Sequence, residues 1–330
     1  MNFTNESILI TGGTGSFGKA FLNELLSSRK FNGVIRVYSR DEYKQYQLNN
    51  VFKGDKRLRF FIGDVRDKTR LLRAMESVEI VIHAAALKQV PTLEYNPLEA
   101  VKTNILGTEN VIDCSINNKV KKAILISSDK AVNPVNLYGA TKLVAEKLFV
   151  QGNSYVGKRP TRFSVVRYGN VAGSRGSVIS IFKSQMVNNL LTVTDERMTR
   201  FWITLEEGVK FVLKCLDIMK GGEIFVPKIP SVKIIELART IAPKAKLKIT
   251  GIRPGEKIHE LLIGQDEARH TKDMEDYFEI EPEFASWKDN NKQKKREGKE
   301  LDFEFFYASN ENDWWLTINE IREMLRSLND

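Results

Sequence analysis

The stretch SILITGGTGSFG, residues 7–18, decides the expected fold, because an apolar strand pattern runs directly into a glycine-rich loop. Its glycines fit G-x-x-G-x-x-G from Gly12, and a helical pattern over residues 18–28 follows. Such a loop lets the backbone approach a pyrophosphate, which then meets the free N–H groups of the helix N-terminus. The sequence therefore predicts dinucleotide binding by this loop. The expected contacts are Gly12, Thr14, Gly15, Ser16, Phe17 and Gly18.

Short apolar runs alternate with helical patterns in the first half of the chain, which is typical of βαβ units on a parallel sheet. The expected strands cover residues 7–11, 34–38, 58–62, 80–83, 123–127, 163–167 and 223–226. The expected helices cover residues 18–28, 68–76, 97–117, 138–150, 205–219, 234–241 and 317–328. We predict an α/β fold, a Rossmann-like doubly wound parallel sheet with a smaller C-terminal substrate-binding lobe.

The two parts of this fold are expected to interleave along the chain. Residues 1–170 are predicted to form the nucleotide-binding domain, and residues 200–228 to return to it. The smaller lobe is assigned residues 171–199 and 229–330, where the rhythm changes to loops and shorter helices. Ligands of doubly wound folds bind outside the carboxyl ends of the strands, so we expect the site there, between the two parts.

The formal net charge of +9 admits nucleic acid, a membrane surface or an anionic small substrate as partner. Much of the excess lies in one polar stretch, formed by Lys288, Lys292, Lys294, Lys295, Arg296 and Lys299. Aromatic residues do not interleave with these charges as a nucleic-acid platform requires, so we interpret the stretch as a solvated loop. No nucleic-acid partner is expected.

The cysteines, the histidines and the hydropathy of the chain argue against a disulfide-bonded, a metal-binding and a membrane-spanning protein. Cys114 and Cys215 lie in apolar patterns and are expected to be reduced core residues. The three histidines show no metal-ligand spacing, so no metal is expected. No apolar run approaches the ~18–20 residues of a membrane span, and the short polar start of the chain predicts no signal peptide. We therefore expect a cytoplasmic protein with no membrane partner.

Chemistry is expected from Tyr138 and Lys142, together with Ser128, Asp129 and Lys130. The last three follow an apolar run that predicts a buried parallel strand. Tyr138 and Lys142 are four residues apart, so on a helix they share one face. A nearby ammonium lowers the pKa of a phenol, which can then accept a proton from a sugar hydroxyl. Asp129 and Lys130 supply a second acid/base pair, which indicates a step beyond oxidation.

The second expected strand ends VYSR, residues 37–40, without the acidic residue that holds a free ribose 2′-hydroxyl. The guanidinium of Arg40 can instead bind a 2′-phosphate, and Ser39 can donate a further hydrogen bond to it. These two residues predict NADP as the cofactor. In the alternative interpretation, Asp41 or Glu42 binds the hydroxyl and Arg40 is only a surface charge.

Four more residues complete the group expected to hold the cofactor from the strand ends. Asp64 and Val65 follow the third expected strand and are placed to meet the adenine, although Asp64 could merely cap the next turn. Lys44 and Ala85 are the remaining candidates.

With these motifs the chain resembles the extended short-chain dehydrogenase/reductases, nucleotide-sugar enzymes that share TGxxGxxG and YxxxK. Within them, residues 127–142 resemble the inverting UDP-N-acetylglucosamine 4,6-dehydratases, which begin pseudaminic acid biosynthesis. The resemblance extends through YSRDE (38–42), HAAALK (83–88), RYGNV (167–171), SRGS (174–177), MTRFW (198–202) and GIRPGEK (251–257). It covers about residues 7–262, and the last seventy residues add little to it.

The pair Asp129-Lys130 carries the narrower resemblance. Retaining 4,6-dehydratases resemble the chain elsewhere but have Asp-Glu at this place, and 4-epimerases lack the pair. Ser128 departs from the threonine common in the family, but both residues supply a hydroxyl. Three alternatives remain: a UDP-hexose 4-epimerase, a retaining dehydratase, and a non-catalytic NADP sensor, which would be free to lose Tyr138 or Lys142.

The resemblance implies that UDP-N-acetylglucosamine is converted to UDP-2-acetamido-2,6-dideoxy-β-L-arabino-hexos-4-ulose and water. Tyr138 takes the C4 hydroxyl proton while hydride passes to NADP⁺, and Lys142 holds the nicotinamide ribose. Lys130 then removes the C5 proton as a neutral amine, and Asp129 protonates the leaving C6 hydroxyl. Hydride returns to C6, and C5 is reprotonated on the opposite face. Burial of Lys130 favours the neutral amine and pairing with Asp129 opposes it, and sequence does not decide between them.

Further residues receive roles through the same resemblance. Lys88 is expected to reach both cofactor and sugar, unless it is a helix-edge charge. Asn104 is expected to contact the cofactor, unless it is a satisfied amide inside a helix. Arg200 and Arg253 are candidates for the substrate diphosphate, and Glu256 for its ribose or uracil. The other substrate candidates are Ser128, Asn170, Val171, Ser177 and Thr194.

The resemblance also implies a homo-oligomer that pairs through the helix of Tyr138 and its neighbour. The expected assembly is based on dimers, and a hexamer is one expected size. The product would serve flagellin or surface-polysaccharide glycosylation.

Overall fold

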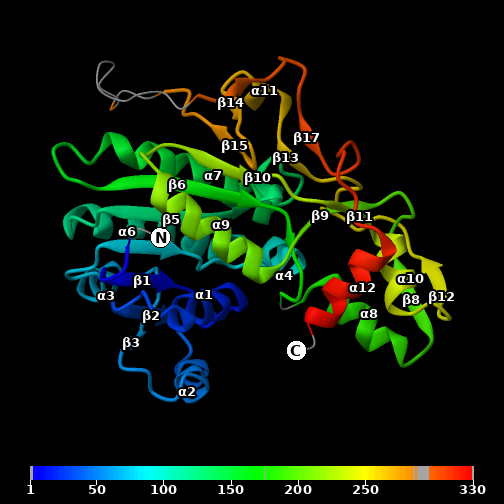
Figure 1. Ribbon diagram of the computed structural model, residues 1–330, viewed down its shortest axis with the longest axis horizontal. Coiled ribbons are helices and arrows are strands. Elements are labelled where there is room, and N and C mark those ends of the chain that lie inside the picture. Colours follow the sequence, from blue (N-terminus) through cyan, green and yellow to red (C-terminus); the bar gives the residue numbers. More distant parts are fainter. Residues whose placement is uncertain (1–2, 175, 285–286, 288–296, 329–330) are drawn as a thin grey trace.

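The computed structural model describes residues 3–174, 176–284, 287 and 297–328, and its centre is a ten-stranded sheet (Figure 1). The strand order is β16-β14-β15-β10-β6-β5-β4-β1-β2-β3. The strands from β10 to β3 in this order run parallel, whereas β15, β14 and β16 extend the sheet antiparallel. The α/β fold with a doubly wound parallel sheet is confirmed.

The parallel strands are β1 (Ile8–Thr11), β2 (Ile35–Ser39), β3 (Leu58–Ile62), β4 (Ile80–His83), β5 (Lys122–Ser128), β6 (Arg162–Tyr168) and β10 (Ile224–Pro227). All residues of β1 and β4 are buried, as in parallel sheets that helices cover on both faces. This burial explains why the strands appear in the sequence as continuous apolar runs.

Two layers of helices cover the sheet, with α1 packed against α9 in one layer and α3, α6 and α7 packed in a row in the other (Figure 1). These helices are α1 (Ser16–Ser27), α3 (Lys68–Ala74), α6 (Gly107–Asn117), α7 (Leu137–Gln151) and α9 (Leu205–Ile218). Shorter elements join them: α2 (Glu42–Val51), α4 (Val90–Tyr95), α5 (Pro97–Ala100), the π-helical turn η1 (Val101–Leu106), and the 3-10 turns η2 (Asp129–Ala131) and η3 (Gly152–Ser154).

The smaller lobe packs around a core of its own, to which Ile179, Phe182, Leu191, Leu237 and Ile321 contribute. Its helices are α8 (Val178–Met186), α10 (Ile234–Ile241) and α12 (Ile318–Ser327), whereas α11 (Gln265–Ala268) contacts β14. Its strands are β7 (Asn170–Val171), β8 (Leu190–Val193), β9 (Thr199–Ile203), β11 (Ser231–Lys233) and β12 (Lys246–Ile249). Strands β13 (Leu261–Ile263) and β17 (Tyr307–Ala308) were predicted to lie in this lobe, but they pack on the core of the large sheet. Helices α10 and α12 pack together, which joins the end of the chain to this core.

Several elements differ from the prediction. Strands β14 (Thr271–Asp273), β15 (Tyr277–Ile280) and β16 (Lys299–Glu300) were assigned to the smaller lobe, yet they extend the large sheet, because β15 pairs with β10. Helix α2 was not predicted, because it is polar and buries only Gln45 and Leu48. The single helix expected over residues 97–117 contains the π-helical turn η1.

Three further predictions concern the cysteines, membrane-spanning helices and the basic stretch. Cys114 and Cys215 are both buried thiols. None of the helices in the described ranges is long and apolar enough to cross a membrane. Of the basic stretch, Lys288, Lys292, Lys294, Lys295 and Arg296 lie outside the described residues.

A buried ion-pair network ties the sheet to the segment after β13. Arg167 on β6 is buried, and its guanidinium donates to the two carboxylate oxygens of Glu146 on α7 at 3.1 and 2.7 Å. The same guanidinium donates to Glu267 on α11 at 2.8 and 2.9 Å. Burial alone would lower the pKa of Arg167, but the two carboxylates outweigh it and raise that pKa.

We predict that Glu146→Leu lowers the free energy of unfolding by about 3–5 kcal/mol, because it leaves a buried charge without its main partner. Glu206→Ala, which removes an exposed partner of Lys210, is the control and should cost less than about 1 kcal/mol. Denaturant unfolding followed by tryptophan fluorescence measures both. Equal losses in the two variants would contradict the role given to Arg167.

Candidate active site

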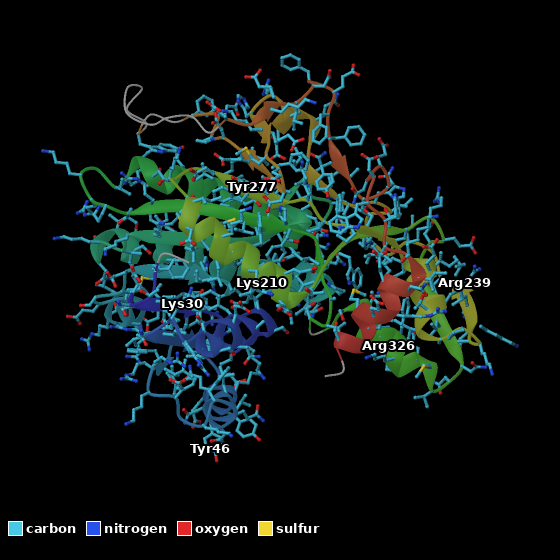
Figure 2. The ribbon with its side chains drawn as sticks, viewed as in Figure 1. Lys30, Tyr46, Lys210, Arg239, Tyr277 and Arg326 are labelled. Atoms are coloured by element: carbon cyan, nitrogen blue, oxygen red, sulfur yellow. The ribbon has the colours of Figure 1, made fainter. Side chains whose placement is uncertain are left out.

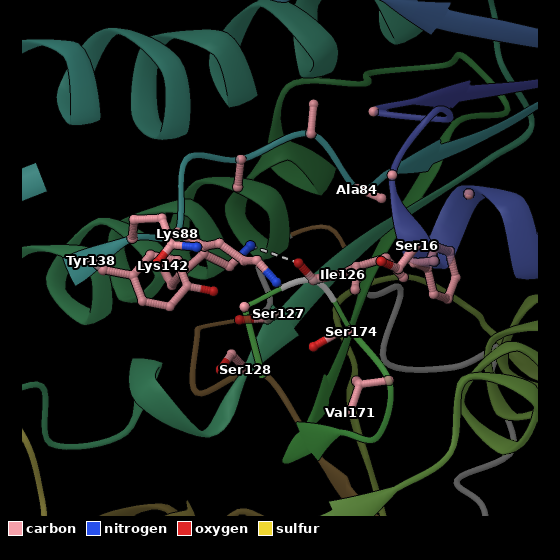
Figure 3. Close-up of a pocket in the computed structure, with 18 of the residues that line it drawn as sticks. Ser16, Ala84, Lys88, Ile126, Ser127, Ser128, Tyr138, Lys142, Val171 and Ser174 are labelled. Atoms are coloured by element: carbon pink, nitrogen blue, oxygen red, sulfur yellow. Dashed lines mark hydrogen bonds between the residues drawn. The ribbon is translucent and has the colours of Figure 1, made fainter. Parts of the chain in front are cut away.

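A cavity of about 640 Å³ opens at the carboxyl ends of the parallel strands and joins the glycine loop to the surroundings of Tyr138 (Figure 3). The predicted residues that line it are Gly12, Thr14, Gly15, Ser16, Phe17, Gly18, Ser39, Arg40, Lys44, Asp64, Val65, Ala85, Lys88, Ser128, Asp129, Lys130, Tyr138, Lys142, Asn170, Val171 and Ser177. The predicted residues outside its lining are Asn104, Thr194, Arg200, Arg253 and Glu256. The structure thus brings the two expected acid/base pairs and the glycine loop into one cavity.

The glycine loop depends on two residues that lack a Cβ. Gly12 has φ +67°, and a Cβ there would lie 2.9 Å from the backbone of Ala85. A Cβ on Gly18 would lie 2.2 Å from the carbonyl oxygen of Gly13, so α1 could not pack this closely on the loop. Helix α1 begins after Gly15, which supplies no side chain to cap its first N–H groups. This cradle fits a pyrophosphate.

The end of β2 carries the residues expected to select the cofactor. The Arg40 side chain is 54% exposed, and its guanidinium lies 3.8 Å from Asp64. Asp64 does cap the next turn, because it accepts the Arg66 N–H at 2.9 Å. Burial would raise the pKa of Asp64, but Arg66 and Arg40 outweigh it and lower that pKa. Asp41 is engaged as the cap of α2, where it accepts the Lys44 N–H at 3.0 Å.

Tyr138 and Lys142 share one face of α7 and both line the cavity, but their ionisation differs from our expectation. Lys142 donates to the carbonyl of Ile126 at 2.6 Å, and burial lowers its pKa to about 8 (Figure 3). Burial raises the pKa of Tyr138, and Lys130 and a hydrogen bond with Ser128 oppose this rise. The cation that assists the phenolate is therefore Lys130, because the ammonium of Lys142 is directed at Ile126.

Lys130 lies between two buried carboxylates. Its Nζ donates to Asp129 Oδ1 at 2.9 Å and to Asn170 Oδ1 at 3.2 Å, and it lies 3.1 Å from Glu260 Oε1. The carboxylates of Asp129 and Glu260 are 1% and 3% exposed. Burial would lower the pKa of Lys130, but these two carboxylates outweigh it and raise that pKa. The competition left open by the sequence is decided in favour of pairing, and Lys130 is an ammonium here.

Glu260 was missed by the sequence analysis, where its only distinguishing feature was a charge placed directly before an apolar strand. Its carboxylate lies 3.7 Å from Nε of Arg200 and 3.8 Å from Nζ of Lys257. Arg200 was predicted to bind the diphosphate. It is buried, and its guanidinium donates to the carbonyl groups of Thr199, Ile258 and Lys257. Arg200 therefore fixes the segment that carries Glu260.

The π-helical turn η1 brings one expected and one unexpected residue to the site. Asn104 accepts the Leu87 N–H at 2.8 Å and donates to the Leu87 carbonyl at 2.9 Å and to Thr141 Oγ1 at 3.0 Å, so it ties the loop after β4 to α7. This geometry favours its interpretation as a satisfied amide. Thr103 and Ser127, which we did not predict, line the cavity with buried hydroxyls that have no hydrogen-bond partner in the described part of the chain. A bound molecule can satisfy both.

The remaining predicted residues lie apart from the cavity. Thr194 is buried and donates to Met198 Sδ at 3.4 Å. Arg253 is exposed, and its backbone N–H donates to Glu256 at 3.3 Å. Within the described ranges, no group of three His, Cys, Asp or Glu side chains could hold a metal ion.

Known proteins resemble this chain over nearly its whole length. The family model described as polysaccharide biosynthesis protein matches residues 8–282. A Campylobacter jejuni subsp. jejuni serotype O:2 protein named UDP-N-acetylglucosamine 4,6-dehydratase (inverting) is 52% identical, and the match covers 98% of each chain. A Rickettsia canadensis protein named UDP-glucose 4-epimerase is 38% identical over 99% of this chain and 97% of its own. The X-ray structure of Pen from Bacillus thuringiensis matches with a TM-score of 0.90 at 38% identity, over 100% of this chain and 99% of that one.

We predict that Gly18→Ala weakens binding of a nicotinamide dinucleotide by about tenfold or more, because the new Cβ must push α1 away from the loop. Gly208→Ala is the matched control, since the atoms nearest its Cβ would lie 3.9 Å away. Isothermal titration of the two variants measures the effect. Unchanged affinity in Gly18→Ala would show that the close approach of α1 and the loop does not form the binding site.

Proposed function

This chain belongs to the polysaccharide biosynthesis protein family, and we propose that it is a UDP-N-acetylglucosamine 4,6-dehydratase that inverts C5. The reaction yields UDP-2-acetamido-2,6-dideoxy-β-L-arabino-hexos-4-ulose and water. One observation carries the proposal: Asp129 and Lys130 line the same cavity as Tyr138 and the glycine loop. The groups for oxidation and for elimination can therefore act on one bound sugar.

A nicotinamide dinucleotide fits the glycine loop, whose backbone contacts leave no room for a Cβ at Gly12 or Gly18. The loop would hold the pyrophosphate, and the hydroxyls of Thr103 and Ser127, which lack a hydrogen-bond partner among the described residues, offer further hydrogen bonds in the cavity. Bound there, the nicotinamide supplies the hydride acceptor for C4 and the hydride donor for C6. The finer proposal is NADP, because Arg40 is exposed at the end of β2 while Asp41 is engaged as a helix cap.

The protein's own residues move three protons. Tyr138 takes the proton of the C4 hydroxyl, and the charge of Lys130 favours the phenolate that does so. Once Tyr138 is neutral, Lys130 has lost one counter-charge, and it passes a proton along its 2.9 Å hydrogen bond to Asp129. The neutral amine then removes the C5 proton, and Asp129 returns a proton to the C6 oxygen as water leaves. Asp129 and Lys130 end this step in their original charge states.

The substrate is proposed to contact the far side of the same cavity. Asn170, Val171 and Ser177 line it beyond Lys130, as does Lys88, whose pKa is lowered by burial. The candidates outside the lining, Thr194, Arg253 and Glu256, are proposed for the nucleotide part of UDP-N-acetylglucosamine.

Assembly and pathway form part of the same proposal. Exposed apolar side chains on α4, α5, η1 and α7 support pairing through the helix of Tyr138; they belong to Tyr95, Leu98, Leu106 and Val144. We propose a dimer-based homo-oligomer, with a hexamer as the larger form, that acts in the cytoplasm in pseudaminic acid synthesis.

A UDP-glucose 4-epimerase is the second candidate, because the Rickettsia canadensis relative carries that name. An epimerase would use Tyr138 and the dinucleotide but would need neither Asp129 nor Lys130. Mass spectrometry of the product separates the two, since dehydration removes water and epimerisation leaves the mass unchanged.

We predict that Lys130→Met lowers the dehydration rate by roughly 10²–10⁴-fold, the usual worth of a positioned general base. C4 oxidation should slow less, because Tyr138 loses only an assisting charge, so NADPH and a 4-keto sugar should accumulate. Tyr138→Phe is the matched variant and should form no NADPH. Absorbance at the NADPH band and product mass spectra measure both, and near-normal water loss in Lys130→Met would refute the proposal.

We predict that NADP co-purifies with the protein, because Arg40 can bind the 2′-phosphate with a charge-assisted hydrogen bond. Arg40→Asp should lower the NADP content and favour NAD. Chromatography of the nucleotide released by heat measures the ratio. Bound NAD in the unmodified protein would overturn the assignment of Arg40.

A further inference from the structure

Glu260 lies beside Lys130 but takes part in none of the proton transfers above. Its carboxylate is buried 3.1 Å from the ammonium. Its backbone is fixed by Ser309, just after β17: the Glu260 N–H donates to Ser309 Oγ at 2.9 Å, and the Ser309 N–H donates to the Glu260 carbonyl at 2.8 Å. The backbone that carries this carboxylate is therefore fixed by the C-terminal region of the chain.

The oxygen atoms around Nζ of Lys130 suit the number of N–H groups that Lys130 carries before and after it loses a proton. An ammonium has three N–H groups: Lys130 donates to Asp129 and to Asn170, and the ion-paired oxygen of Glu260 lies 3.1 Å from its nitrogen. When one proton has passed to Asp129, the neutral amine keeps two N–H groups, for which Asn170 is an acceptor and the Glu260 oxygen, 3.1 Å from the nitrogen, is within reach. The electron pair then occupies the direction of the bond that was broken.

Neighbouring charges decide which carboxylate accepts the proton. Glu260 has Arg200 at 3.7 Å and Lys257 at 3.8 Å, so it keeps cationic partners when Lys130 becomes neutral. The carboxylate of Asp129 forms its ion pair with Lys130, and its interaction with Lys257 is weaker than that of Glu260. A buried carboxylate without a cation favours its protonated form. Asp129, which already accepts the 2.9 Å hydrogen bond of Lys130, is therefore the carboxylate that we expect to take the proton.

We propose that Glu260 is a positioning residue of the elimination, which holds the amine of Lys130 in place after that amine has passed a proton to Asp129. In this transfer an Nζ–H bond breaks, an Oδ1–H bond forms on Asp129, and the electron pair stays on Nζ to take up the C5 proton. The inference rests on the proposed function, because it requires Lys130 to act as the C5 base.

The charged and titratable groups that face Lys130 come from four parts of the fold. Asp129 lies on η2, Tyr138 on α7, Arg200 on β9, and Lys257 and Glu260 in the segment before β13. The two carboxylates favour the charged form of Lys130, and Arg200 opposes them. Removing the charge of Glu260 should therefore make the neutral amine of Lys130 more abundant.

The first test measures the chemical reactivity of the Lys130 amine and requires no enzyme turnover. Glu260→Gln keeps the shape and an acceptor oxygen but removes the charge, and acetic anhydride reacts only with neutral amines. At pH 8, acetylation of Lys130, whose side chain is 26% exposed, should speed up about tenfold or more, since one close opposite charge shifts a pKa by about 1–3 units. Peptide mass spectrometry measures it, with Lys142 in the same digests as internal reference. Glu311→Gln, which removes an exposed carboxylate two residues after Ser309, is the control and should leave the rate unchanged.

The second test reads the reaction. Glu260→Leu removes both charge and acceptor, so kcat for dehydration should fall by about 10–100-fold while KM stays unchanged, with NADPH accumulating. Glu260→Gln, which retains an acceptor, should lose less. Formation of NADPH in each variant shows that the fold and the oxidation step are intact.

The outcomes separate this inference from the proposed function. If the unmodified protein dehydrates but Glu260→Gln leaves acetylation of Lys130 unchanged, the inference is wrong and the proposed function stands. If acetylation of Lys130 and Lys142 rises together, the variant has opened the cavity, and Glu260 has only a structural role. If the unmodified protein releases no water from UDP-N-acetylglucosamine, the proposed function itself fails, whatever the labelling shows.

Discussion

The ammonium of Lys130, held between two buried carboxylates, is the interaction on which the site depends. Taking charges out of water is unfavourable, and removing any partner of a buried charge leaves the others uncompensated. Asp129 and Glu260 stabilise the cation, and the cation in turn favours the phenolate of Tyr138. Lys130 and its two carboxylates, Asp129 and Glu260, can therefore support oxidation while Lys130 is charged and elimination once it is neutral.

Segments that are far apart in the chain meet at the carboxyl ends of the strands and bring the charged groups around Lys130 together. Asp129 and Lys130 follow β5, Asn170 begins β7, and Arg200 on β9 holds the backbone that leads to Glu260. The C-terminal region closes the arrangement, because β17 pairs with β13 and Ser309 fixes Glu260. Figure 2 shows the two parts that meet here, with Tyr277 of β15 on the large sheet and Arg239 of α10 in the smaller lobe.

The sequence predicted the features that depend on neighbouring residues. It did not predict the features that depend on contacts between residues far apart in the chain. Apolar runs, the glycine loop and the spacing of Tyr138 and Lys142 are local, and the sheet, its helices and the shared cavity agree with them. Strands β14 to β16 are short, and only their pairing beside β10 shows that they extend the large sheet. The charge state of Lys130 could not be predicted either, because Glu260 lies 130 residues away in the chain and 3.1 Å away in space.

The central claim is that one cavity carries out both oxidation and elimination, with Lys130 as the C5 base. The most direct measurement is proton NMR of the product formed by the unmodified protein from UDP-N-acetylglucosamine in deuterated water. The account predicts a 4-keto-6-deoxy sugar with deuterium at C5 and the L-arabino configuration. A product of unchanged mass, or one that keeps its original proton at C5, would contradict it.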